Sequence, residues 1–96
     1  MSLPIGSHKI VADGVVGTSG KATRVYGFIV NSDGTGSVTA VYDGTSAGGT
    51  AMDSLVGTAS VSTRISYPGG LYFPNGCYLN LDAHVTYIVA IYSQES

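Results

Sequence analysis

The sequence predicts an all-β protein, an antiparallel β-sandwich or jelly-roll-like fold of about seven or eight short strands. Composition is the first reason: Gly (14), Ser (12) and Thr (9) make up over a third of the 96 residues, Val contributes 11 and Tyr 7, and Glu occurs once. β-Branched and aromatic residues favour strands, whereas good helix formers are scarce here. The second reason is that short apolar runs are separated by turn signals at regular intervals, which is typical of a sandwich or barrel.

The first half of the chain contains three candidate strands, over Lys9–Val16, Arg24–Asn31 and Ser37–Tyr42. Asp13-Gly14 interrupts the first of these and indicates a bulge or a bend. Asp33-Gly34 favours a hairpin between the second and the third, because glycine tolerates the positive φ that tight connections require.

The second half begins with a predicted loop over Asp43–Thr50, which is rich in Gly and small polar residues. Pro68-Gly69-Gly70 is expected to end one strand, and Pro74-Asn75-Gly76 to turn the chain. The strands expected here are Leu55–Ser60, Ser62–Tyr67, Leu71–Phe73, Cys77–Asp82 and Val85–Tyr92. In Cys77–Asp82 apolar and polar residues alternate, as in a strand with one buried face.

The length of 96 residues predicts one domain, with a single sandwich over residues 9–96. Residues 1–8 are expected to form a flexible N-terminal arm, and the last residues, 93–96, to be loosely ordered, because chain ends are poorly ordered unless something holds them.

Two of the predicted strands, Arg24–Asn31 and Val85–Tyr92, are apolar on both faces. In a sandwich only one face of each sheet meets the core, so the other face needs a cover, either another copy of the chain or a larger partner. The alternative is that these are central strands whose outward side chains simply lie at the surface. The predicted interface residues are Tyr26, Phe28, Tyr87, Ile88 and Tyr92.

Charge excludes several classes of protein. Lys, Arg, Asp and Glu make up only 10% of the chain, and four basic residues with a net charge of -2 give no patch for a phosphate backbone, so no nucleic acid is expected as a partner. No apolar run approaches the about 18 to 20 residues that span a bilayer, so no membrane is expected either. A single cysteine, Cys77, excludes an intrachain disulfide framework and a cysteine-built zinc site.

The sequence does not predict an enzyme, a cofactor or a metal site. Cys77 and His84 could be drawn as a nucleophile and a base, but Cys77 shares the apolar face of its strand and is expected to be buried and inert. Asp82 and His84 could hold an ion at a three-fold axis; the favoured interpretation is that both are turn residues. The seven tyrosines could stack on sugars or anchor a protein interface.

Two segments carry a resemblance to a known class of proteins. Val38–Thr50 (Val-Thr-Ala-Val-Tyr-Asp-Gly-Thr-Ser-Ala-Gly-Gly-Thr) and Pro68–Leu79 (Pro-Gly-Gly-Leu-Tyr-Phe-Pro-Asn-Gly-Cys-Tyr-Leu), with the closing strand Val85–Tyr92, resemble small all-β structural proteins of tailed bacteriophages. These include capsid decoration (cement) proteins, and the resemblance covers roughly residues 24 to 92. It implies a β-sandwich or jelly-roll subunit, often a trimer, that docks on an assembled shell and has no catalytic residues.

The expected function is therefore that of a virion structural protein, a capsid decoration subunit. Its expected partners are itself, as a homotrimer, and the major capsid protein or another virion protein. Its expected location is the virion, assembled in the host cytoplasm. The alternative is a carbohydrate-binding or receptor-recognition β-domain of a tail or fibre protein.

Overall fold

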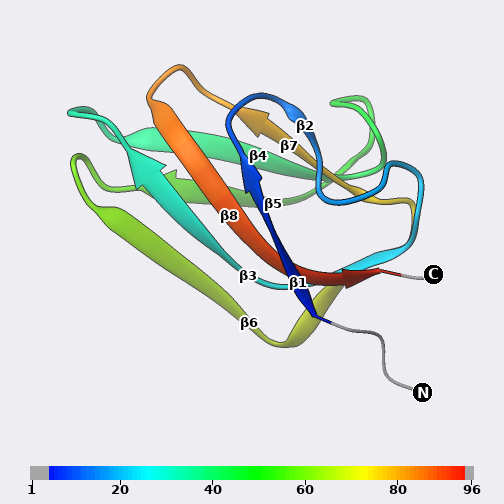
Figure 1. Ribbon diagram of the computed structural model, residues 1–96. Helices are drawn as coiled ribbons and strands as arrows, with labels where there is room; N and C mark the ends of the chain where they lie inside the picture. The colour runs from blue at the N-terminus through cyan, green and yellow to red at the C-terminus, as the bar shows by residue number, and fades with distance from the viewer. Residues whose placement is uncertain (1–4, 95–96) are drawn as a thin grey trace.

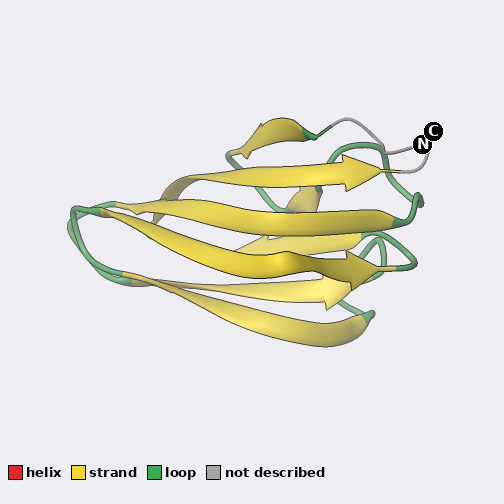
Figure 2. Cartoon of the chain, turned by 90° about the horizontal axis from the view of Figure 1, so that it is seen from below, coloured by secondary structure: helices red, strands yellow, loops and turns green. Residues whose placement is uncertain are grey.

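The computed structural model describes residues 5–94, and all regular structure in that range is β-strand (Figures 1 and 2). Within these residues no helix has the length and apolar character needed to cross a membrane. The eight strands are β1 (Gly6–Ile10), β2 (Gly14–Val15), β3 (Thr23–Ser32), β4 (Ser37–Asp43), β5 (Thr50–Gly57), β6 (Ser62–Phe73), β7 (Cys77–Leu81) and β8 (Val85–Gln94).

The strands form two four-stranded antiparallel sheets. Sheet A has the order β1-β8-β3-β6, and sheet B has the order β2-β7-β4-β5. The first strand pairs with the last, the second with the seventh, the third with the sixth and the fourth with the fifth. This nested pairing is the connectivity of a jelly roll, so the predicted β-sandwich is confirmed.

The core lies between the two sheets, where both inner faces contribute apolar side chains. Phe28 on β3 packs edge-on against the Tyr67 ring of β6, with ring centres 6.0 Å apart. In β7 the predicted alternation is confirmed, because Cys77 and Leu79 are fully buried while Tyr78 between them is half-buried. The buried apolar residues are Ile10, Val16, Val25, Phe28, Val30, Val41, Leu55, Phe73, Cys77, Leu79, Ile88 and Ala90.

The predicted Asp33-Gly34 hairpin is wrong, because β3 belongs to sheet A and β4 to sheet B. The turn carries the chain from one sheet to the other, and among the described glycines Gly34 is not one with a positive φ. The Asp33 carboxylate instead accepts the Thr35 N–H at 2.8 Å, and the Ser32 and Ser37 hydroxyls lie 2.7 Å apart at the crossing. Turn residues thus set a local chain reversal, not the choice of neighbouring strand.

The hairpin that does form joins β4 and β5 across the predicted loop, whose strand-free part is 44–49. β5 begins at Thr50, five residues before the predicted start at Leu55. Its first residues have little intrinsic strand preference and are held by pairing with β4, for example Ser54 opposite Ala40. Beyond Gly57 the chain turns towards sheet A, where Ser60 has a φ of 61°.

The prediction that Pro68-Gly69-Gly70 ends a strand is wrong. These residues form a bulge within β6. The pairing of β3 with β6 jumps from Val25–Leu71 to Gly27–Ser66, so that residues 67–70 of β6 lie opposite a single residue of β3, Tyr26. Gly69 and Gly70 have φ values of 79° and 86°, which glycine adopts at little cost.

The N-terminal strand corrects the predicted boundary of the arm. Gly6, Ser7 and His8 belong to β1 and pair with Tyr92, Ile91 and Ala90 of β8, and Ile10 is buried in the core. The arm predicted over residues 1–8 is therefore partly a strand of sheet A, and residues 1–4 lie outside the described residues. β8 likewise continues to Gln94, which bonds the Val16 and Thr18 carbonyl oxygens through its side-chain amide at 3.2 and 2.9 Å.

Candidate functional site

The outer surface of sheet A is the leading candidate for a functional site. Ile29 on β3 and Val89 on β8 each lie between two fully buried neighbours, so the alternation of a strand directs both outward. They pair with one another across the two central strands of the sheet. We call this outer surface the A face, and it includes Lys9, Arg24, Tyr26, Ile29, Arg64, Tyr87, Val89 and Ile91.

The A face has an apolar centre with basic residues at its borders. Lys9 of β1 pairs with Val89, and Arg64 of β6 pairs with Ile29, so one row across the sheet runs from Lys9 through two apolar side chains to Arg64. The Lys9 Nζ lies 4.8 Å from the centre of the Tyr87 ring, which is a favourable cation–π distance. The apolar side chains are half-buried by their neighbours on the sheet.

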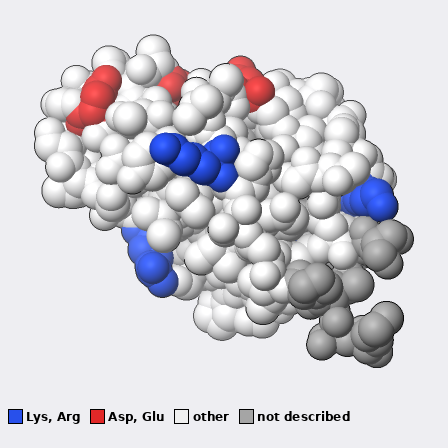
Figure 3. Space-filling model, viewed as in Figure 1, with Lys and Arg blue, Asp and Glu red and all other residues white. Residues whose placement is uncertain are grey.

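Charge is divided between the two sheets. The strands of sheet A contain Lys9, Arg24 and Arg64, three of the chain's four basic residues, and no Asp or Glu. The strands of sheet B contain Asp43 and Asp53 and no Lys or Arg. Figure 3, viewed with sheet A in front, shows basic side chains on this side of the molecule and acidic ones along its upper border. The A face is consequently suited to an apolar partner surface that carries negative charge.

Of the five predicted interface residues, Tyr26 and Tyr87 are half-buried and contribute to the outer side of sheet A. The Tyr26 hydroxyl lies 3.4 Å from Ser93 Oγ. Phe28 and Ile88 are 0% exposed in the core, so their assignment to an interface is corrected. Tyr92 packs against the core cluster.

A bulge is the physical reason for the Phe28 error. The register of β3 shifts between Val25 and Gly27 against both neighbouring strands, which reverses the alternation beyond Tyr26. Tyr26 and Phe28, two residues apart, therefore point to opposite sides. Val89 and Ile91 were not among the predicted interface residues, although they share the alternation of Tyr87. Lys9 and Arg64 lie beside the apolar centre because of strand pairing, which the alternation of residues in the sequence does not reveal.

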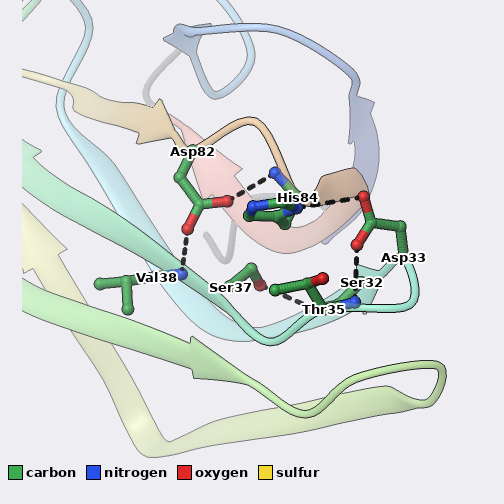
Figure 4. Close-up of polar contacts among 7 residues, drawn as sticks. All are labelled: Ser32, Asp33, Thr35, Ser37, Val38, Asp82 and His84. Carbon is green, nitrogen blue, oxygen red and sulfur yellow. Dashed lines mark hydrogen bonds and ion pairs between the residues drawn. The ribbon is translucent and has the colours of Figure 1, made fainter.

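A polar cluster joins two turns at one end of the sandwich (Figure 4). His84 Nδ1 lies 3.3 Å from Asp33 Oδ2, and the Asp33 N–H donates to the His84 carbonyl oxygen at 2.9 Å. Asp82 accepts two backbone bonds, from the Val38 N–H at 2.6 Å and from the His84 N–H at 2.8 Å. These bonds, that from Val38 first, lower the pKa of Asp82 below its usual value.

The geometry of this cluster explains what Asp82 and His84 do in the fold. Both lie in or beside the turn that joins β7 to β8, and each Asp82 carboxylate oxygen already accepts a backbone N–H. Asp33 and His84 have side chains 49% and 47% exposed, so the contact between them is well solvated. No group of three or more His, Cys, Asp or Glu residues with metal-binding geometry occurs within residues 5–94, and no cavity is found there.

Cys77 lies in the core at the start of β7, and His84 follows the other end of that strand, so the structure does not bring the two together. Burial, and to a lesser extent the charge of Asp43, raises the pKa of the Cys77 thiol to about 12. A thiol in this environment stays protonated at neutral pH and is a poor nucleophile.

Comparison of the chain with known protein families, with curated proteins and with solved structures found no match.

Proposed function

We propose that this chain is a capsid decoration (cement) subunit of a tailed bacteriophage, which associates as a homotrimer and docks on the major capsid protein or another virion protein. In this proposal the protein is assembled into virions in the host cytoplasm. The subunit contributes to the shell by binding and not by catalysis.

The observation that carries the proposal is the A face, an apolar outer sheet surface on strands whose charged residues, Lys9, Arg24 and Arg64, are all basic. Apolar surface rimmed by polar residues is characteristic of an interaction site, and charge on the rim helps to select a partner of opposite charge. The low charge of the whole chain, 10% of residues, gives the subunit little of the charged surface that keeps ordinary domains apart. Jelly-roll connectivity supports the proposal by analogy, since viral capsid domains use it, although a fold alone does not define a function.

The test has two measurements on the same purified chain. Light scattering coupled to size-exclusion chromatography should give a mass close to three times the 9.8 kDa of one chain. Assembled capsids should carry the tagged chain with them on sedimentation, and mass spectrometry of cross-linked partners should identify a capsid or tail protein. A chain that stays monomeric and sediments with no virion component contradicts the proposal.

The second candidate function is carbohydrate or receptor recognition by a tail or fibre protein. One observation favours it: Tyr72 on β6 is 46% exposed, and the Arg24 guanidinium lies 5.3 Å from the centre of its ring. Lectin domains also use jelly rolls. This function predicts glycan binding on an array that is lost in Tyr72→Ala and retained in Val11→Ala, an exposed residue elsewhere on the chain.

A further inference from the structure

The side chain of His8 ties the first strand of sheet A to the segment that connects the two sheets. β1 is an outermost strand and pairs on one side, with β8. His8 is half-buried and lies on the inward side of β1, the side that it shares with buried Ile10. Its Nδ1 atom accepts the Gly17 N–H at 2.9 Å. Within residues 5–94 this is the one side-chain hydrogen bond that β1 makes.

The segment that receives this bond, residues 16–22, runs from β2 in sheet B to β3 in sheet A, and we call it the connecting segment. Gly17 has a φ of 68° and approaches β8 so closely that a Cβ atom there would stand 2.8 Å from Tyr92 Cε2. The Gln94 side chain holds the same segment from β8 with three hydrogen bonds. The connecting segment is therefore held by Gln94 of β8 and by His8 of β1.

The direction of the bond between His8 and Gly17 defines the charge of the imidazole. A backbone N–H can only donate, so the Nδ1 atom must present a lone pair, and the single proton of the neutral ring then lies on Nε2. An imidazolium carries a proton on both nitrogens. In that form two N–H groups would point at one another, so the bond exists only while His8 is neutral.

The groups around His8 offer a positive charge no partner. Facing it from β8 is Tyr92, an uncharged phenol, and the connecting segment contains one charged residue, Lys21, which is a cation. Lys9, the other ionisable residue of β1, lies on the opposite face of the sheet, and β2 has no ionisable side chain. The carboxylate of Asp13, in the turn after β1, accepts a backbone N–H of β7 at 2.7 Å. Neither β1, β8 nor the connecting segment contains an Asp or Glu.

We propose that His8 is a proton-sensitive latch, which holds β1 against the connecting segment at neutral pH and releases it in acid. Histidine is the side chain that changes its charge between about pH 5 and 8. The bond to Gly17 stabilises the neutral ring, so its contribution to stability is present above that range and is lost as the pH falls through it. Because β1 pairs on one side only, release loosens the first strand of the sandwich and gives solvent access to the edge of β8 that β1 covers. This inference goes beyond the proposed function and does not depend on it.

Amide hydrogen exchange followed by NMR at about pH 7.5 and about pH 5 tests the latch, with each rate divided by the intrinsic rate at that pH. The protection of the β1 amides should fall about fivefold between the two pH values, the effect of losing one hydrogen bond. The amides of the central strand β3 report on global stability and should keep their protection. Unchanged protection of β1 in the wild-type chain would overturn the proposal.

Two substitutions at one position separate His8 from every other group that titrates. His8→Asn places an amide oxygen where Nδ1 stands, so it accepts the Gly17 N–H at both pH values, and the fall in β1 protection should disappear. His8→Ala removes the acceptor, so β1 protection should be low at both pH values. A fall that persists in His8→Asn contradicts the latch, and this outcome does not depend on whether His8→Ala folds.

His84 provides the matched control, because the chain has two histidines. Its Nδ1 atom lies 3.3 Å from an Asp33 carboxylate oxygen, so a proton on this ring strengthens the contact instead of breaking it. His84→Asn should therefore keep the fall in β1 protection, and its loss in this variant would overturn the proposal. All of these measurements are made on the isolated chain, so their outcome is independent of whether the chain binds capsids or forms trimers.

Discussion

Single polar side chains at the ends of the sandwich mainly serve the backbone. Asp82 shows this most clearly, since its two oxygens accept the N–H groups of Val38 and His84 and so tie the start of β4 to the turn before β8. In a sequence, an aspartate close to a histidine suggests a site that holds an ion. Here the carboxylate satisfies backbone donors that the jelly-roll crossings leave unpaired.

Asp82→Asn should test this role through its pH dependence. The folded state lowers the pKa of Asp82, so its contribution to stability is present above the unfolded pKa of about 3.9 and is lost as the pH falls through the folded pKa. Urea unfolding at pH 7 should show the variant about 1 kcal/mol less stable than the wild type. Well below pH 3.9 that difference should shrink; a difference that is the same at both pH values would contradict this role.

Cys77 provides a second test at the scale of one residue. Its full burial and its pKa of about 12 predict that a thiol reagent at pH 8 labels the native chain about a thousandfold more slowly than the denatured chain. Labelling in denaturant is the control for reagent activity. Rapid labelling of the native chain would mean that the start of β7 opens without global unfolding.

At the scale of the element, β3 and β8 explain why two strands are apolar on both faces. They are the two central strands of sheet A and pair with one another, so the side chains on their outer faces cover each other partly. The central position of both strands, which the alternative interpretation of the sequence required, is confirmed. The side chains on the outer faces of these strands are only half-buried, so they still offer apolar surface to the proposed partner.

Neighbouring residues of β8 should respond differently to the same substitution. Ile88→Asp places a carboxylate in the core where Ile88 is 0% exposed, and it should cost at least about 4 kcal/mol, enough to unfold a domain of this size. Tyr87→Asp lies on the A face, so the chain should fold but associate more weakly. Thermal unfolding and sedimentation distinguish the two, and similar unfolding of both variants would show that the assigned faces are wrong.

In the whole molecule, the jelly roll is closed by pairing between β1 and β8, the first and last described strands. β1 pairs along β8, and β8 in turn pairs with β3, so the first and last described strands form half of sheet A. The nested pairing makes the stability of the sandwich depend on residues far apart in the sequence.

Two adjacent residues test whether β1 is part of the sandwich. Ile10 is 5% exposed in the core, and Val11 is 68% exposed in the following turn. Ile10→Ala should lower the free energy of unfolding by about 2 to 4 kcal/mol, because it leaves a cavity beneath sheet A. Val11→Ala should change it by less than about 0.5 kcal/mol. If urea unfolding shows that both substitutions change the free energy of unfolding only slightly, β1 is a loosely held arm and not part of the sandwich.

Residue types and their spacing were enough to predict the all-β class, most of the strand positions and the buried face of β7. These properties depend on residue types and on a period of two, which are local. Three features could be seen only in the folded chain: β3 and β4 lie in different sheets, a bulge at Tyr26 reverses the alternation before Phe28, and basic and acidic residues separate onto different sheets. Strand pairing joins residues far apart in the chain, and periodicity tells which residues share a face but not which face meets the core.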